Sequence, residues 1–233
     1  RVGMITAPDL GLGLHIREAD SGASSVSTDA DQLVIENSAE SGITLLAGTS
    51  NASRLAFGDS GNQKIGMVYY NHGSDYMAFS TNDTQHMKID STGAVTKPLQ
   101  PAFSVNDGGT TTNLSSGAQI TFGTEVFDQN SDFASNSFTA PITGKYQFSY
   151  QMRFQEFDAD FTYFFVQLTT SNRSYTNILG GAQFDADAAY ISFTQSILCD
   201  MDANDTCDIA IAFSGGAAQC DVAHREFTGV LVC

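Results

Sequence analysis

Tryptophan is absent from the sequence, and charged residues of either sign are scarce. Charged residues make up 15% of the 233 positions, and proline occurs 4 times. The 26 acidic residues outnumber the 10 Lys and Arg, so the formal net charge is −16. Binding to nucleic acid needs clustered cations that release counterions from phosphates. Because the sequence has no basic run, we expect no nucleic-acid partner.

Long apolar runs and helical periodicity are also missing. No stretch reaches the roughly 18 apolar residues of a membrane-spanning helix, and no secretory leader pattern is present, so we expect no membrane insertion. The chain begins at Arg1 and not at Met, from which we expect a fragment of a longer protein. Apolar residues recur mainly at every second position, and 21 Gly separate them. This pattern predicts an all-β fold of short strands and tight turns.

Cysteine is confined to the second half, at Cys199, Cys207, Cys220 and Cys233. The spacing forms neither a CxxC pair nor a zinc pattern. Cysteine packs well in apolar cores, so we expect free, buried thiols. Cys199 and Cys207 flank a turn, so the alternative is that they lie opposite each other on paired strands. The disulfide state of the four cysteines stays open.

Residues 1–98 are predicted to form a β-rich shaft or neck. The chain here buries too little apolar surface to fold well alone, so we predict three copies around an axis. A modest stand-alone β-domain is the alternative. Two prolines within residues 97–101 break the pattern and, with the more acidic composition that follows, place a domain boundary between residues 98 and 99. Strands are expected at 12–17, 32–36, 43–46, 54–57, 64–70, 76–81 and 86–90.

Residues 99–233 are predicted to form longer, aromatic strands of a sandwich or jelly roll. Segments 161–168 and 227–233 are apolar on both faces, so one face is expected in the core and the other in a subunit interface. Apolar faces of period two are expected from Ile120 and Phe122; Tyr146, Phe148, Tyr150 and Met152; Phe161, Tyr163 and Phe165; Ile191 and Phe193; and Ile209, Ile211 and Phe213.

Residues 138–148 read FTAPITGKYQF, and this run resembles the signature of the C1q-like head family. Residues 101–105 resemble the family's opening strand and residues 227–231 its closing strand. Asn204 stands where the family has a turn glycine, a position that asparagine tolerates because it accepts left-handed geometry. The resemblance implies a trimeric jelly roll of the complement and tumour-necrosis-factor type over residues 99–233.

Residues 32–96 resemble a module that recurs in the fibres of tailed bacteriophages. Segments 31–36, 42–46, 54–59, 65–70, 77–82 and 86–93 carry the likeness. This resemblance implies the distal part of a tail fibre, located in the virion and joined to other tail proteins through its N-terminal side. We therefore expect a receptor-binding homotrimer that attaches to a glycan or an outer-membrane protein of the bacterial surface. A purely structural, trimerising fibre component is the alternative.

No catalytic motif is present, and the four His are scattered along the chain. We expect no enzyme; a glycan depolymerase, built on acid pairs such as Asp158 and Asp160 or Asp185 and Asp187, is the weaker alternative. No cofactor is expected. The acidic stretch 200–208 partly resembles the start of a calcium loop. Counted from Asp200, the sixth position is Asp205 and not Gly, and the twelfth is Ile211 and not Glu, which excludes an EF-hand; a polar hairpin turn is the simpler interpretation. Calcium stays open.

Receptor contacts are expected in loops 107–117, 155–160, 171–187 and 214–225, where exposed aromatic and amide side chains suit glycan or protein ligands. The candidate receptor-binding residues are Asn172, Arg173, Tyr175, Phe184 and Tyr190.

Overall fold

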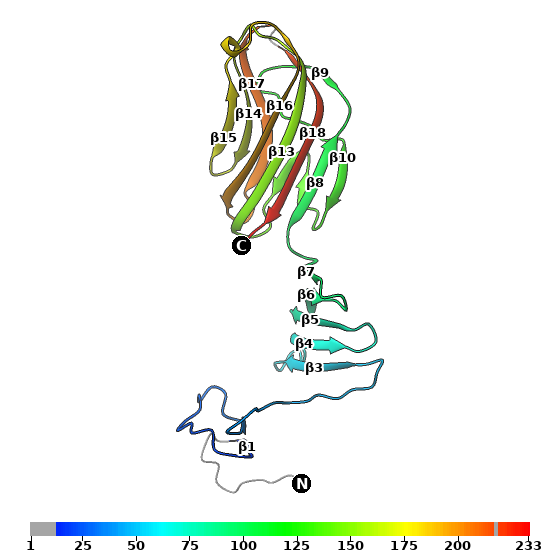
Figure 1. Ribbon diagram of the computed structural model, residues 1–233, viewed down its shortest axis with the longest axis vertical. Helices are drawn as coiled ribbons and strands as arrows, with labels where there is room; N and C mark the ends of the chain where they lie inside the picture. The colour runs from blue at the N-terminus through cyan, green and yellow to red at the C-terminus, as the bar shows by residue number, and fades with distance from the viewer. Residues whose placement is uncertain (1–12, 217–218) are drawn as a thin grey trace. The chain divides into compact units, whose positions relative to one another are not determined.

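The computed structural model describes residues 13–216 and 219–233, and nearly all of its regular structure is β-strand (Figure 1). By its internal contacts the chain divides into two compact units, residues 1–78 and 79–233. The boundary predicted between residues 98 and 99 stays a prediction. Among the described residues, no helix has the length and apolar character needed to cross a membrane.

The strands before the Pro-rich segment are short. A parallel pair forms from β1 (Leu14–Arg17) and β2 (Leu33–Glu36). A five-stranded sheet follows in the order of the sequence. Its strands are β3 (Ala52–Phe57), β4 (Gly66–Asn71), β5 (Tyr76–Thr81), β6 (Thr84–Ile89) and β7 (Val95–Thr96).

Six of the seven strands predicted here are confirmed to within a few residues, and the strand at 43–46 is wrong. Residues 43–46 adopt no strand, and Leu46 is 90% exposed. Apolar content favours a strand only where a neighbouring strand can pair with it. Residue 12, at the edge of the first predicted strand, lies outside the described residues.

The remaining strands build the head. They are β8 (Ala102–Asp107), β9 (Thr111–Leu114), β10 (Thr124–Asp128), β11 (Phe133–Ala134), β12 (Ser137–Thr139), β13 (Gly144–Phe157), β14 (Phe161–Thr170), β15 (Ser174–Leu179), β16 (Ala188–Met201), β17 (Thr206–Gly215) and β18 (Cys220–Leu231), with one 3-10 turn, η1 (Gly181–Gln183).

The head strands form two sheets that face each other (Figure 1). One sheet has the order β10-β8-β18-β13-β16, with β9 beside β18, and the other has the order β11-β12-β17-β14-β15. From β12 onward the chain alternates between the sheets, except at the β14–β15 hairpin, and β18 closes beside the opening strand β8. This strand order is that of a jelly roll, so the predicted fold class is confirmed for the head.

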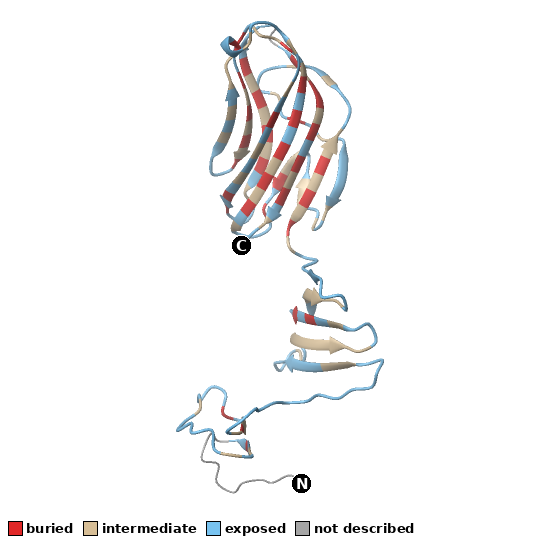
Figure 2. Ribbon diagram, viewed as in Figure 1, coloured by how far each residue is buried: buried red, intermediate tan, exposed pale blue. Residues whose placement is uncertain are grey.

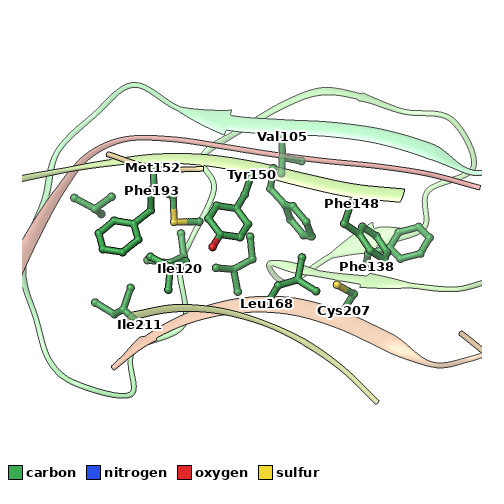
Figure 3. Packing of buried hydrophobic residues seen from close by; sticks show 14 of the residues in the cluster. Val105, Ile120, Phe138, Phe148, Tyr150, Met152, Leu168, Phe193, Cys207 and Ile211 are labelled. Carbon is green, nitrogen blue, oxygen red and sulfur yellow. The ribbon is translucent and has the colours of Figure 1, made fainter. Parts of the chain in front are cut away.

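Strand β13 shows how the sequence builds the core. Buried residues alternate along β13 with less buried ones (Figure 2). Tyr146, Phe148, Tyr150 and Met152 are the buried ones, and polar residues stand between them. These four residues were predicted to share one face, and all four belong to the core cluster. Phe148, Tyr150 and Met152 point into the space between the sheets in Figure 3. Phe138, the first residue of the family-like signature, stacks on the ring of Phe103 at 5.1 Å, so it anchors the core.

In strand β14, the prediction that Phe161, Tyr163 and Phe165 share one face is wrong. Phe164, Val166 and Leu168 are fully buried, whereas Tyr163 is 37% exposed and Phe165 is partly exposed. A register shift against β17 lies between Phe161 and Tyr163. The shift adds one residue, so Phe161 stays buried while the alternation after it reverses.

Three of the four thiols are buried and free, as expected, but Cys233 is exposed. The idea that Cys199 and Cys207 oppose each other on paired strands is wrong. Cys199 lies in β16 and Cys207 in β17, and these strands belong to different sheets. In a jelly roll a turn that joins consecutive strands can cross between layers, so sequence proximity does not imply pairing.

The predicted loops are shorter than expected, because strands extend into all four. Strand β9 lies within 107–117, β13 continues through residue 157, β15 lies within 171–187, and β17 and β18 occupy most of 214–225. Residues 217 and 218 of the last loop lie outside the described residues. Ile120 is buried and Phe122 is partly buried, but around them only an isolated bridge forms, from Gln119 to Ala210.

Candidate surface-binding site

Asn172 and Arg173 occupy the tight turn between β14 and β15, next to the end of β16. The Asn172 amide donates to the Asp200 carbonyl oxygen at 3.0 Å. The Arg173 guanidinium donates to the Asp200 carboxylate at 2.8 Å. Both partners of this ion pair are about half exposed, where such pairs add little stability. The side chains of Asn172 and Arg173 therefore hold this turn against β16, and each already donates a hydrogen bond to Asp200.

Tyr175 faces inward from β15 and packs against the core. Burial raises the pKa of Tyr175 to about 12, and the neighbouring Cys199 thiol adds to the shift. A side chain in this position contributes mainly packing, so the structure does not present Tyr175 as a surface contact.

Phe184 and Tyr190 lie at the other end of the head. Phe184 follows η1, and its ring lies 5.5 Å from that of the buried Phe157. Tyr190 on β16 is 64% exposed, and the Arg153 guanidinium lies 5.3 Å from its ring centroid. Of the five candidates, Tyr190 thus presents the most accessible aromatic surface.

The five candidates do not form one site. Tyr190 and Asp200, the partner of Asn172 and Arg173, are ten residues apart on the same strand. At about 3.3 Å per residue, that separation is about 33 Å. A small ligand at one end of the head therefore cannot reach the other.

The acidic stretch after β16 forms a hairpin turn. The Asp202 backbone N–H donates to the Asp205 carboxylate at 2.8 Å, and Asn204 has φ +75°. The left-handed geometry expected at Asn204 is therefore confirmed. Among the described residues, no group of three His, Cys, Asp or Glu is arranged to hold a metal ion. The calcium question stays a prediction.

A polar depression lies on the outer face of β16, β13 and β18. Its volume is about 430 Å³, and Ser149, Gln151, Thr194, Ser196 and Glu226 are among its lining residues. The Ser149 and Ser196 hydroxyls lie 2.8 Å apart. Tyr150 also lines the depression, but its side chain is 3% exposed, so the surface offers hydrogen bonds and no accessible ring face.

The outer face of the second sheet carries two aromatic side chains that were predicted to share a face with Phe161. Tyr163, Phe165 and Gln167 point outward from β14, beside Thr176 and Ile178 of β15. These five residues are named the β14 platform. The signal for it was present in the sequence, since segment 161–168 is apolar on both faces. Only the bulge decides which aromatic residues face outward.

Comparison with known proteins gives matches of structure alone. No protein-family model matches the sequence, and no curated protein sequence matches it. The globular domain of zebrafish complement 1qA is similar to 57% of this chain and covers 98% of its own, with 18% identity and a TM-score of 0.45. Murine APRIL is similar to 55% of this chain and covers 98% of its own, with 13% identity and a TM-score of 0.36. The jelly-roll assignment therefore stands on the strand order of the head itself.

Proposed function

We propose that this chain is the distal part of a trimeric bacteriophage tail fibre, and that its head attaches the virion to the bacterial surface. The receptor is a surface glycan or an outer-membrane protein. The N-terminal side joins the chain to other tail proteins. The likeness of residues 32–96 to fibre modules and of residues 138–148 to the C1q-like signature supports this proposal.

The observation that carries the proposal is the apolar surface of the N-terminal unit. Leu46 is 90% exposed, Leu55 is 56% exposed and Phe57 is 55% exposed. Exposed apolar surface costs about 25 cal/mol per Å², so a lone chain gains by covering it. Three copies around an axis would cover the same surface on each other, which is the arrangement of a fibre shaft.

Three heads also explain how weak contacts could hold a virion on a cell. Once one head has bound, the other two meet their receptors at high effective concentration. Each head then needs only a modest affinity for a repeated surface structure. A glycan, which repeats over the whole bacterial surface, meets that requirement well.

Sedimentation equilibrium and cell binding test the proposal together. The purified chain should sediment at three times its 24.8 kDa mass, and the labelled trimer should adsorb to particular members of a bacterial panel. Excess unlabelled chain should compete with it. A trimer that binds no strain would favour the purely structural role. Release of oligosaccharides from the bound cells would instead favour a depolymerase.

A further inference from the structure

We infer that the β14 platform binds an uncharged carbohydrate through the rings of Tyr163 and Phe165. This inference deepens the proposed function and rests on it, since it names the ligand class and the place of contact on the head.

The two rings form a nearly parallel pair on the outside of the sandwich. Their centroids lie 5.8 Å apart and their planes differ by 11°. Strand pairing sets small neighbours on one side, because Phe165 lies opposite Ala212 and Tyr163 lies opposite Ser214 on β17. These short side chains leave the aromatic rings raised above that side of the sheet. Ile178, 57% exposed, borders them on the β15 side.

Hydrogen-bonding groups continue the platform along the same strands. The Gln167 amide donates to the Thr176 hydroxyl at 3.0 Å. The Thr169 hydroxyl lies 3.4 Å from both the Gln167 amide oxygen and the Ser174 hydroxyl. A sugar ring presents C–H groups on its faces and hydroxyls on its rim. Aromatic rings beside amide and hydroxyl groups match both parts of such a ligand.

The charges on and around the β14 platform favour an uncharged ligand. Asp208 is the one charged side chain among the outward-facing residues of β14, β15 and β17. With a net charge of −16, the chain repels acidic polymers, and a basic partner would find a single carboxylate here. An uncharged glycan is not repelled by the negative charge of the chain, and it needs no further carboxylates for binding.

The exposed apolar area argues against a protein partner at this face. Tyr163 is 37% exposed, Ile178 is 57% exposed and Phe165 is partly exposed. With about 150–250 Å² for a large side chain, the three together offer on the order of 250 Å². A stable protein–protein contact needs about 800 Å² from each partner. A ligand of one or two sugar rings fits the smaller area.

The test uses the full chain, an array of neutral and uronic-acid oligosaccharides, and the bacterial strain that the wild type binds. Tyr163→Ala and Phe165→Ser should each weaken binding to a neutral glycan and to cells by about tenfold or more, with unchanged sedimentation. Phe127→Ala is the matched control, because it removes a half-exposed aromatic ring from β10 in the other sheet, and it should bind like the wild type. Periodate treatment of the cells should abolish binding, and protease treatment should not.

The outcomes separate this site from the proposed function. If the wild type binds cells and both platform variants bind equally well, the site is wrong while the function stands. Sensitivity to protease alone, or a preference for uronic-acid oligomers, overturns the ligand class. A platform variant that no longer sediments as the wild type does overturns the site as well, because the rings would then serve a subunit contact. Binding to neutral glycans without binding to any cell overturns attachment and keeps the site.

Discussion

Gly229 is a residue at which a single methyl group decides the packing. It is buried in β18, opposite Phe148 on β13 and Phe103 on β8. A Cβ at this position would overlap the rings of both phenylalanines. The two rings close the core over the glycine backbone, so the site has no room for any side chain.

Gly229→Ala should therefore lower the free energy of unfolding by about 1–3 kcal/mol, the usual cost of overpacking a core. Urea unfolding followed by circular dichroism measures the change. Gly108→Ala is the control, because a Cβ there meets nothing within 4 Å. Equal stability of the two variants would mean that the rings move aside freely.

Tyr150 links the core to the pH dependence of stability. The side chain is 3% exposed, and its hydroxyl donates to the Gln195 amide oxygen at 3.0 Å. Burial raises the pKa of Tyr150 from 10.0 to about 12. The neutral phenol is thus favoured in the folded state. The contribution of Tyr150 to the free energy of unfolding is fully present below pH 10.

Stability should fall between pH 10 and about pH 12, where the unfolded tyrosine ionises and the folded one does not. The slope from this residue approaches about 1.4 kcal/mol per pH unit. Unfolding free energies over this range should fall less steeply in Tyr150→Phe than in the wild type. A spectrophotometric titration in which all 8 Tyr ionise together near pH 10 would contradict the assignment.

At the scale of elements, Arg225 fastens β18 to the segments that precede and follow β9. Its side chain is 2% exposed and donates to the Asp107 carboxylate at 2.6 Å, the Thr111 hydroxyl at 2.9 Å and the Gly109 carbonyl oxygen at 3.2 Å. It also donates to the Thr121 carbonyl oxygen. Burial lowers the pKa of Arg225, while Asp107 opposes that shift. One side chain thus holds a long connection against the edge of the sheet.

Arg225→Leu should cost about 3 kcal/mol of unfolding free energy, because it strands Asp107 and several backbone carbonyls without their donor. Arg153→Leu removes an exposed arginine from β13 and should change stability by less than about 0.5 kcal/mol. Chemical denaturation of both variants gives the comparison. Hydrogen exchange at residues 107–111 should also accelerate in Arg225→Leu alone, and a uniform response of both variants would refute the fastening role.

Sequence patterns predicted elements well where one strand keeps one phase. Strand β13 alternates without interruption from Tyr146 to Phe154, so its buried face could be read directly. Strand β14 could not be read in this way, because a bulge near Phe161 depends on its pairing with β17. The sequence therefore showed that Tyr163 and Phe165 lie in an apolar strand, but it did not show that both side chains face outward. The strand predicted at 43–46 was wrong for a related reason, because a strand needs a neighbouring strand to pair with, and composition does not reveal that neighbour.

The two-residue turn between β5 and β6 was also missed. Asn82 and Asp83 both have φ near +50°, at 49° and 55°. Two such residues form the type I′ turn that joins hairpin strands most tightly. Turns were expected where glycine interrupts the apolar pattern. Asparagine and aspartate reach the same left-handed geometry although they carry a side chain. Local chemistry could have located this hairpin, unlike the bulge in β14.

At the scale of the whole molecule, the two units differ in how they bury apolar side chains. The head encloses a continuous core of aromatic and aliphatic residues (Figure 3). Strand β3 instead ends in a run of exposed residues (Figure 2). Leu55 and Phe57, two positions apart on one face, are both more than half exposed. The first pattern suits a domain that is stable by itself, and the second suits a surface that other copies cover. Assembly should therefore depend on β3 more than the folding of the head does.

Replacing Leu55 and Phe57 together by Ser should weaken the proposed trimer while leaving the head folded. Each copy loses two large apolar side chains, worth about 1.5–3 kcal/mol apiece when buried, and the loss is repeated three times in the assembly. In sedimentation equilibrium the double variant should dissociate at a higher concentration than the wild type. Ala56→Ser, on the opposite face of the same strand, should dissociate like the wild type. A double variant that matches this control, or a wild type that sediments at 24.8 kDa, would show that β3 meets no other copy of the chain.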